Sequence, residues 1–533
     1  MRRRDLHSIG IAPALTETSV TRPTSALILR AAPALALAGT LLLITGCSSL
    51  TLDSARLSAA EVKSTLATDR EALARDVEPL AGPLTMEGAV ARAIKYNADR
   101  RYRAMEEAVA MGAFEVGQFD MLPKVIASAG YRNRSNDLIT RSTDSVTGQP
   151  SLANPYISSS REAWTGDVGI SWSLLDFGQS YYAARQNADR VLIAGERRRK
   201  ALHNLMQEVR TAYWRVVAAQ QLLPVLRTTI TDSEAALQDS QKVEAAKIRS
   251  PLEPLRYQRQ LLENLRLLEL IEQELSTARV ELASLTNLPL ASTFTVVEPA
   301  ADNNGGWLQQ PVEQLEEFAL MRNPDLREGM YNARIAQQET RRTLLKLFPG
   351  VSFNYGFRSS SDAYLIHRQW TETGAQISFN LLGLLSAPAQ MRLADTGVAL
   401  ANQRRMATQM AVLTQLHIAR LQYANATSQL ARADAIVGVD NRLAQQVANQ
   451  EEARKMTVLD RVSQQSAAVL SQLRRYQALS NSQAAASRLQ ATLGLEPVVP
   501  DAATTPLSDL TTAVAASMQS WNRGQLPPAE AAP

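Results

Sequence analysis

The sequence predicts an α+β membrane protein with two structural repeats, each made of long coiled-coil helices plus two β-strands. Three observations predict this class. Residues 351–358 alternate between bulky apolar and small or polar side chains, which is the period of a strand with two different faces. A related stretch, residues 123–132, occurs earlier in the chain. Segments of about 70 residues contain almost no Gly or Pro, which indicates helices about 100 Å long.

The repeat is visible from equivalent residues at constant spacing. Pro123 and Pro349 are 226 residues apart, and the same spacing joins Asn97 to Asn323. After the second strand of each copy the spacing becomes 207, so the first copy carries 19 extra residues (226 minus 207) between its strands. A spacing that holds over this distance indicates one unit written twice.

The repeat and the Pro- and Gly-rich stretches divide the chain into six segments. They are a lipoprotein signal peptide (1–46), a lipidated N-terminal segment (47–83), repeat one (84–290), a linker (291–311), repeat two (312–497) and a flexible C-terminal tail (498–533). Strands are predicted at about 124–134, 165–176, 350–359 and 370–382. Helices are predicted at about 85–119, 179–247, 252–285, 312–346, 387–455 and 459–492.

The N-terminus has the layout of a secretory signal, with arginines before an apolar run that is too short to span a bilayer. Cys47 directly follows this run and is the only cysteine in the protein. A buried structural thiol is the simpler interpretation of a lone cysteine. Its position resembles a bacterial lipobox, in which the cysteine becomes the lipidated first residue of the mature chain. Ser48 after it favours the outer membrane.

The strands predict an oligomeric barrel. Their apolar stretches of about nine to eleven residues match a tilted bilayer crossing. Four strands cannot form an open sheet in lipid, where every backbone hydrogen bond must be satisfied. Two chains would give eight strands with a filled interior, and three would give twelve with a channel. The residues predicted to face lipid are Val351, Phe353, Tyr355, Phe357, Ile170, Trp172, Ile377 and Phe379, whereas Ser352, Asn354, Ser378 and Asn380 are predicted to face the lumen.

Other classes of function find no support in the sequence. The net charge of +4 is too small for this length to indicate a nucleic-acid partner. There is no P-loop and no G-x-S-x-G motif, and the four histidines are scattered. We therefore expect neither an enzyme nor a metal site, and no cofactor apart from the covalent lipid on Cys47.

Four features together form a family pattern. They are the doubled helix–strand–strand–long-helix–return-helix unit, the Thr85-Met86-Glu87-Gly88-Ala89 start, the Asn97-Ala98-Asp99 and Asn323-Pro324-Asp325 breaks, and the Leu122-Pro123 and Phe348-Pro349 strand entries. Over about residues 84–497 this pattern resembles the TolC-like outer membrane efflux protein family, and with the lipobox its lipoprotein branch. The resemblance implies a homotrimer, whose twelve-stranded outer-membrane β-barrel continues into a periplasmic α-helical barrel.

The resemblance implies a passive exit duct that works with a periplasmic adaptor (membrane fusion protein) and an inner-membrane pump. Two functions remain open within this fold: efflux of small molecules by a tripartite pump, and secretion of protein or polysaccharide by a type I system. A non-conducting periplasmic coiled-coil scaffold is the competing class. The apolar strand faces favour a duct, because a scaffold needs no lipid-facing aromatic residues.

The resemblance also assigns roles to the two helical turns, as periplasmic tips where the adaptor docks. Tip one is Lys247, Ile248, Arg249, Ser250 and Pro251, and tip two is Lys455, Met456, Thr457 and Val458. Asp460 matches the family position whose carboxylates ring the tunnel entrance as a gate, and Glu253 is its counterpart in the first repeat. Ser463 replaces the second acid of the family, so the ring is expected to be weaker. Asp460 also fits a simple helix-start charge.

Overall fold

The computed structural model describes residues 56–150, 155–246, 252–299, 306–453, 455–499 and 501–527. The chain divides into two compact units, Met1–Ala72 and Leu73–Pro533. In the first unit the described residues form most of helix α2 (Ala59–Ala74), whose side chains are all exposed. The predicted signal peptide and Cys47 lie outside the described residues. Among the described helices, none combines the length and the apolar character that a membrane crossing requires.

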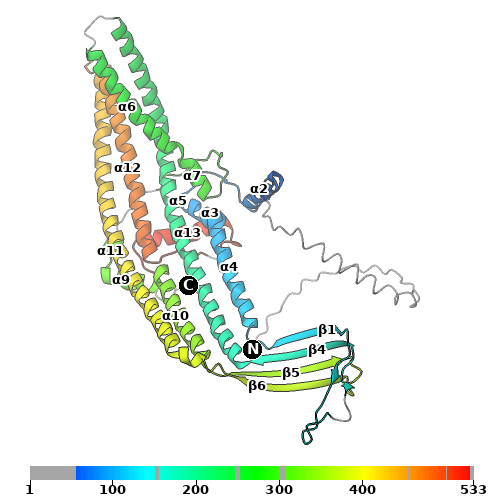
Figure 1. The fold of residues 1–533 in the computed structure, drawn as a ribbon. Coiled ribbons are helices and arrows are strands. Elements are labelled where there is room, and N and C mark those ends of the chain that lie inside the picture. The colour runs from blue at the N-terminus through cyan, green and yellow to red at the C-terminus, as the bar shows by residue number, and fades with distance from the viewer. Residues whose placement is uncertain are drawn as a thin grey trace. The chain divides into compact units, whose positions relative to one another are not determined.

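One antiparallel sheet of four strands brings the two repeats together (Figure 1). Its order is β1 (Lys124–Asn133), β4 (Glu162–Ser173), β5 (Gly350–Ser360) and β6 (Gln369–Ser378). The β4–β5 pair joins the first repeat to the second. A small sheet of β2 (Ile139–Thr140) and β3 (Tyr156–Ile157) lies in the long segment between β1 and β4.

Two strands end earlier than predicted, because local hydrogen bonds start the next helix. The Ser173 hydroxyl accepts a hydrogen bond from the Asp176 N–H at 3.2 Å and caps the helix that begins at Leu174. After β6, the Asn380 side chain accepts a hydrogen bond from the Gly383 N–H at 3.0 Å. Phe379 and Asn380, which we predicted on a strand, therefore lie in the turn after β6.

The helices follow the predicted repeat. The first repeat contains α3 (Met86–Tyr96), α4 (Ala98–Phe119), α5 (Leu174–Ala245), α6 (Leu252–Ser276) and α7 (Ala278–Leu285). The second contains α8 (Gly306–Gln309), α9 (Val312–Arg322), α10 (Pro324–Leu345), α11 (Gly383–Glu452) and α12 (Val458–Thr492). The long helices α5 and α11 have 72 and 70 residues, and both run from the sheet to the far end of the helices (Figure 1).

Equivalent asparagines join the shorter helices end to end in the two repeats. The Asn97 side chain caps α4 by accepting from the Arg100 N–H, and its amide donates to the carbonyl of Leu285 at the end of α7. The Asn323 side chain caps α10, and its amide donates to the carbonyl of Thr492 at the end of α12. The two predicted breaks are therefore junctions, where one helix starts as another ends.

The C-terminal tail differs from the flexible segment that we predicted. Residues Leu507–Asn522 form helix α13. Its apolar residues recur at helical spacing, and Leu510, Val514, Met518 and Trp521 are buried in the main hydrophobic core. Burial of these side chains stabilises the helix despite the Ala- and Pro-rich composition around it.

Candidate functional site

The first candidate surface is the apolar face of the sheet. Strand register places Ile170 opposite Tyr355, and Trp172 opposite Phe353. These side chains share a face because residues directly opposite each other point to the same side. Ile377 on the same face is 73% exposed in the single chain. The strand residues predicted to face lipid all lie on this one face: Val351, Phe353, Tyr355, Phe357, Ile170, Trp172 and Ile377.

The opposite face of the sheet is polar and carries smaller side chains. Ser171 lies opposite Asn354, and Gly169 lies opposite Gly356. Charges on this face are paired, since Arg358 Nη1 lies 3.0 Å from Glu372 Oε2. The predicted lumen residues Ser352, Asn354 and Ser378 lie on this polar face. The sheet thus has one apolar face and one polar face.

The two edges of the sheet are open in the single chain. β1 and β6 each pair with one strand only, among the residues that the structure describes. Each edge strand is 10 residues long. Backbone N–H and C=O groups on a sheet edge bind another strand readily, so both edges are suited to pairing with further copies of the chain.

The second candidate surface is the turn between α11 and α12. Thr457 and Asp460 form a capping box at the start of α12: the backbone N–H and hydroxyl of Thr457 donate to Asp460 Oδ2 at 2.9 and 2.7 Å. The hydrogen bond from the Thr457 side chain, followed by that from its backbone, lowers the pKa of Asp460. The carboxylate predicted for the gate is therefore engaged locally in the single chain.

Arg461 links the start of α12 to both long helices. Its guanidinium donates to Asp232 of α5 at 2.9 Å and lies 3.6 Å from the carboxylate of Glu451 in α11. Asp232 was not predicted as a site residue. It lies 229 residues before Arg461, and nothing in its local sequence marks it as an ion-pair partner.

Comparison with known proteins finds a family match over part of the chain. Residues 89–288 match the family model described as "Outer membrane efflux protein". The matched residues make up most of the first repeat, and over them the chain is similar to outer membrane efflux proteins. This result confirms the predicted resemblance, and it agrees with the expectation of a channel rather than an enzyme.

Solved structures of outer membrane channels share the fold of this chain. The CmeC outer membrane channel of Campylobacter jejuni has a TM-score of 0.59 at 12% identity, covering 83% of this chain and 90% of that chain. The outer-membrane channel OprN has a TM-score of 0.58 at 17% identity, covering 77% and 89%. The open state of the Neisseria gonorrhoeae MtrE channel has a TM-score of 0.58 at 13% identity, covering 77% and 88%. A search of curated protein sequences finds no match.

The remaining predicted sites belong to the two helical turns expected from the sequence. The four residues of tip two, Lys455, Met456, Thr457 and Val458, are exposed. Beside them, a groove of about 990 Å³ lies between the ends of α5, α6 and α12. The tip-one residues Lys247, Ile248, Arg249, Ser250 and Pro251 lie outside the described residues. Glu253 lies in α6, but its side chain is outside the described set. Within the described ranges, no group of three His, Cys, Asp or Glu could hold a metal ion.

Proposed function

We propose that this chain is the outer-membrane exit duct of a tripartite efflux pump, which exports small molecules such as drugs, and that three copies form the duct. The observation that carries the proposal is the four-stranded sheet with one exposed apolar face and two open edges. Lipid tolerates a sheet only when all its backbone groups are paired. Head-to-tail pairing of β1 in one copy with β6 in the next closes a ring.

The packing of the helices also favours a closed ring of copies. Four helices form a layer in which α4 packs on α5, α5 on α10, and α10 on α11. Helices α4 and α11 therefore lie at the two edges of this layer. Both edge helices expose apolar side chains, including Val109 and Val116 in α4 and Leu393 and Leu400 in α11. These edges would be covered by the neighbouring copies. Three copies supply twelve strands, which leave an open channel, whereas eight strands leave an interior filled by side chains.

The duct requires partners, because the sequence offers no nucleotide site to drive transport. We place a periplasmic adaptor at tip two, where exposed Lys455 and Met456 lie beside the groove between α5, α6 and α12. An inner-membrane pump then supplies the energy. The polar face of the sheet forms the lumen, and lipid on Cys47 anchors the N-terminus in the outer membrane.

Oligomeric state and conductance test the duct. Native mass spectrometry of the detergent-extracted full chain is expected to show a trimer, and planar bilayers are expected to show stable channels. Cysteines at Ala127 in β1 and Ala375 in β6, which lie on the apolar face, should cross-link copies into species no larger than trimers. Either single-cysteine variant is the control. A dimer, or a protein without conductance, would overturn the proposal.

Transport assays separate efflux from secretion. The chain would be expressed with the adaptor and pump encoded beside its gene, in a strain that lacks its own outer-membrane efflux channel. We expect the minimum inhibitory concentrations of several drugs to rise. Unchanged drug susceptibility together with export of a protein or polysaccharide would instead identify a secretion duct.

A further inference from the structure

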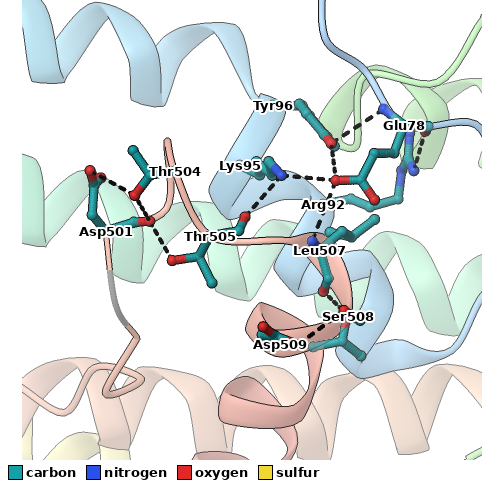
Figure 2. Close-up of polar contacts among 11 residues, drawn as sticks. Glu78, Arg92, Lys95, Tyr96, Asp501, Thr504, Thr505, Leu507, Ser508 and Asp509 are labelled. Atoms are coloured by element: carbon teal, nitrogen blue, oxygen red, sulfur yellow. Dashed lines mark hydrogen bonds and ion pairs between the residues drawn. The ribbon is translucent and has the colours of Figure 1, made fainter.

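The C-terminal segment 501–527 is hydrogen-bonded to the region where the second compact unit begins. Glu78 Oε1 accepts hydrogen bonds from Lys95 Nζ at 2.9 Å and from the Tyr96 hydroxyl at 3.1 Å (Figure 2). The N–H of Leu507, the first residue of α13, lies 3.4 Å from the same oxygen. Lys95 Nζ also donates to the Thr505 carbonyl at 2.9 Å, across a sequence separation of 410 residues.

The same segment spans both repeats. Helix α13 packs on α3 of the first repeat and contacts α8 of the second. At α8, the Gln310 side chain donates to the carbonyl of Gly524 at 3.1 Å. The backbones of Gly306 and Gly524 are so close that a Cβ on Gly306 would lie 2.6 Å from the Arg523 carbonyl carbon. Gly524 also has a φ of +69°, which favours glycine.

Trp521, near the end of α13, closes a small space between α5 and α12. This space is lined by Arg210 of α5, Gln490 of α12 and Trp521 itself. Arg210 is 2% exposed. Its guanidinium donates to Ser487 Oγ at 2.7 Å, to Gln490 Oε1 at 3.0 Å and to Gln483 Oε1 at 2.5 Å, and all three acceptors belong to α12.

Arg210 is thus a buried charge whose hydrogen-bond partners are all neutral. Burial lowers its pKa to about 10, so it stays charged at neutral pH. A buried charge gains strongly from contact with water. As long as water is excluded, the two terminal nitrogens of the guanidinium donate to α12 and tie that helix to α5. Water admitted beside it would compete for these bonds.

We propose that segment 501–527 is a strap that holds the end of α12 against α5, and that it acts through Trp521, which keeps water away from Arg210. Trp521 is a positioning residue in this view. Besides the packing between the two helices, α12 is then held to α5 by Arg210 near its end and by Arg461 at its start. The consequence for gating rests on the proposed function: in an exit duct, a loosened α12 would free tip two and raise spontaneous opening.

A double-mutant cycle measured by hydrogen exchange on the full-length protein tests the strap. Trp521→Ala is expected to speed amide exchange in residues 483–492 about tenfold, because water reaches the buried charge. Arg210→Met alone should also speed exchange in residues 483–492, because the hydrogen bonds that tie α12 to α5 are lost and their acceptors on α12 lose a donor. In the Arg210→Met background, Trp521→Ala should have a clearly smaller effect, because no charge remains to be hydrated.

Trp521→Phe is the matched control, and it should stay close to wild type because it still covers the site. Trp521→Leu replaces Trp521→Ala if the alanine variant does not fold. Equal effects of the Trp521 change in both backgrounds would show packing alone and would overturn the strap mechanism. Unchanged amide exchange in residues 483–492 of the Trp521→Ala variant would also overturn the strap mechanism.

Single-channel recording separates this inference from the proposed function. Trp521→Ala should open more often than wild type, whereas in the Arg210→Met background the Trp521→Ala change should raise opening clearly less. If the exchange cycle shows coupling but wild type never conducts, the proposed function fails and the strap stands. If wild type conducts and the exchange cycle shows no coupling, the strap fails and the duct stands.

Discussion

Asp460 stabilises the start of α12 within one chain, and in a trimer it would bring one negative charge per copy to the tip. Two substitutions separate these roles. Asp460→Asn keeps an acceptor oxygen for Thr457 but removes the charge, whereas Asp460→Ala removes both and should cost about 0.3–1.5 kcal/mol of helix-start stability. If the carboxylates ring the entrance, both variants should lose cation selectivity and block by divalent ions in single-channel recordings.

The two Asp460 substitutions distinguish a local helix cap from a gate. A purely local cap predicts that Asp460→Asn conducts like wild type and that only Asp460→Ala is destabilised. Unchanged selectivity and divalent block in both variants would contradict the gate. Substitutions at Lys455 and Met456 serve as controls, because they should disturb pump engagement and drug resistance rather than selectivity.

His203 gives the folded chain a defined pH dependence. Burial lowers its pKa to about 4, while the nearby Glu496 carboxylate opposes this shift and the Arg199 guanidinium adds to it. The unfolded chain takes up the proton first, at a pKa of about 6.5. Stability is therefore unaffected above that pH and falls as the pH drops from about 6.5 towards 4, by up to about 3 kcal/mol.

Thermal unfolding of the detergent-solubilised protein, followed by circular dichroism between pH 7 and pH 4, measures this loss. His203→Gln should lose less stability over the same interval, because its side chain has no proton to take up. The buried ion pairs around His203, such as Arg199 with Glu196, remain in the variant and account for any slope that is left. An identical pH profile for wild type and His203→Gln would contradict the prediction.

At the scale of the element, the sheet is expected to tolerate charge on one face only. Phe353 and Asn354 are neighbours on β5 and point to opposite faces. Phe353→Arg should cost about 2–4 kcal/mol if the apolar face meets lipid near the middle of the bilayer, and Asn354→Arg should cost much less. Urea unfolding of protein refolded into lipid vesicles gives both values.

The two positions make a matched pair, because adjacent residues of one strand lie at nearly the same depth. The same comparison applies to Ile377 and Ser378 on β6, where Ile377 lies on the apolar face and Ser378 on the polar face. Equal losses of stability at the two members of a pair would exclude the assignment of lipid and lumen faces.

At the scale of the whole molecule, the expected mature chain begins at Cys47 and carries lipid. The intact mass of protein extracted from membranes should equal residues 47–533 plus a lipid modification. Cys47→Ser is the control, and it should retain residues 1–46 and incorporate no labelled palmitate. A wild-type chain that is unmodified and still contains residues 1–46 would rule out the anchor.

The sequence by itself determined the elements and their repetition. Alternation along 351–358 predicts β5, and the breaks at Asn97 and Asn323 mark the starts of α4 and α10. These features depend on residues close together in the chain, so local spacing carries them. The spacing of Leu510, Val514 and Met518 fits a helix, but the prediction followed the Ala- and Pro-rich composition around it and missed α13.

Only the tertiary structure decided where the strands end and which distant residues meet. The Ser173 cap and the Asn380 turn end β4 and β6 before the apolar pattern stops. Arg461 meets Asp232 because α12 packs on α5, and Trp521 lies beside Arg210 because α13 crosses from one repeat to the other. Contacts between residues hundreds of positions apart depend on helix packing, and no spacing along the chain specifies them.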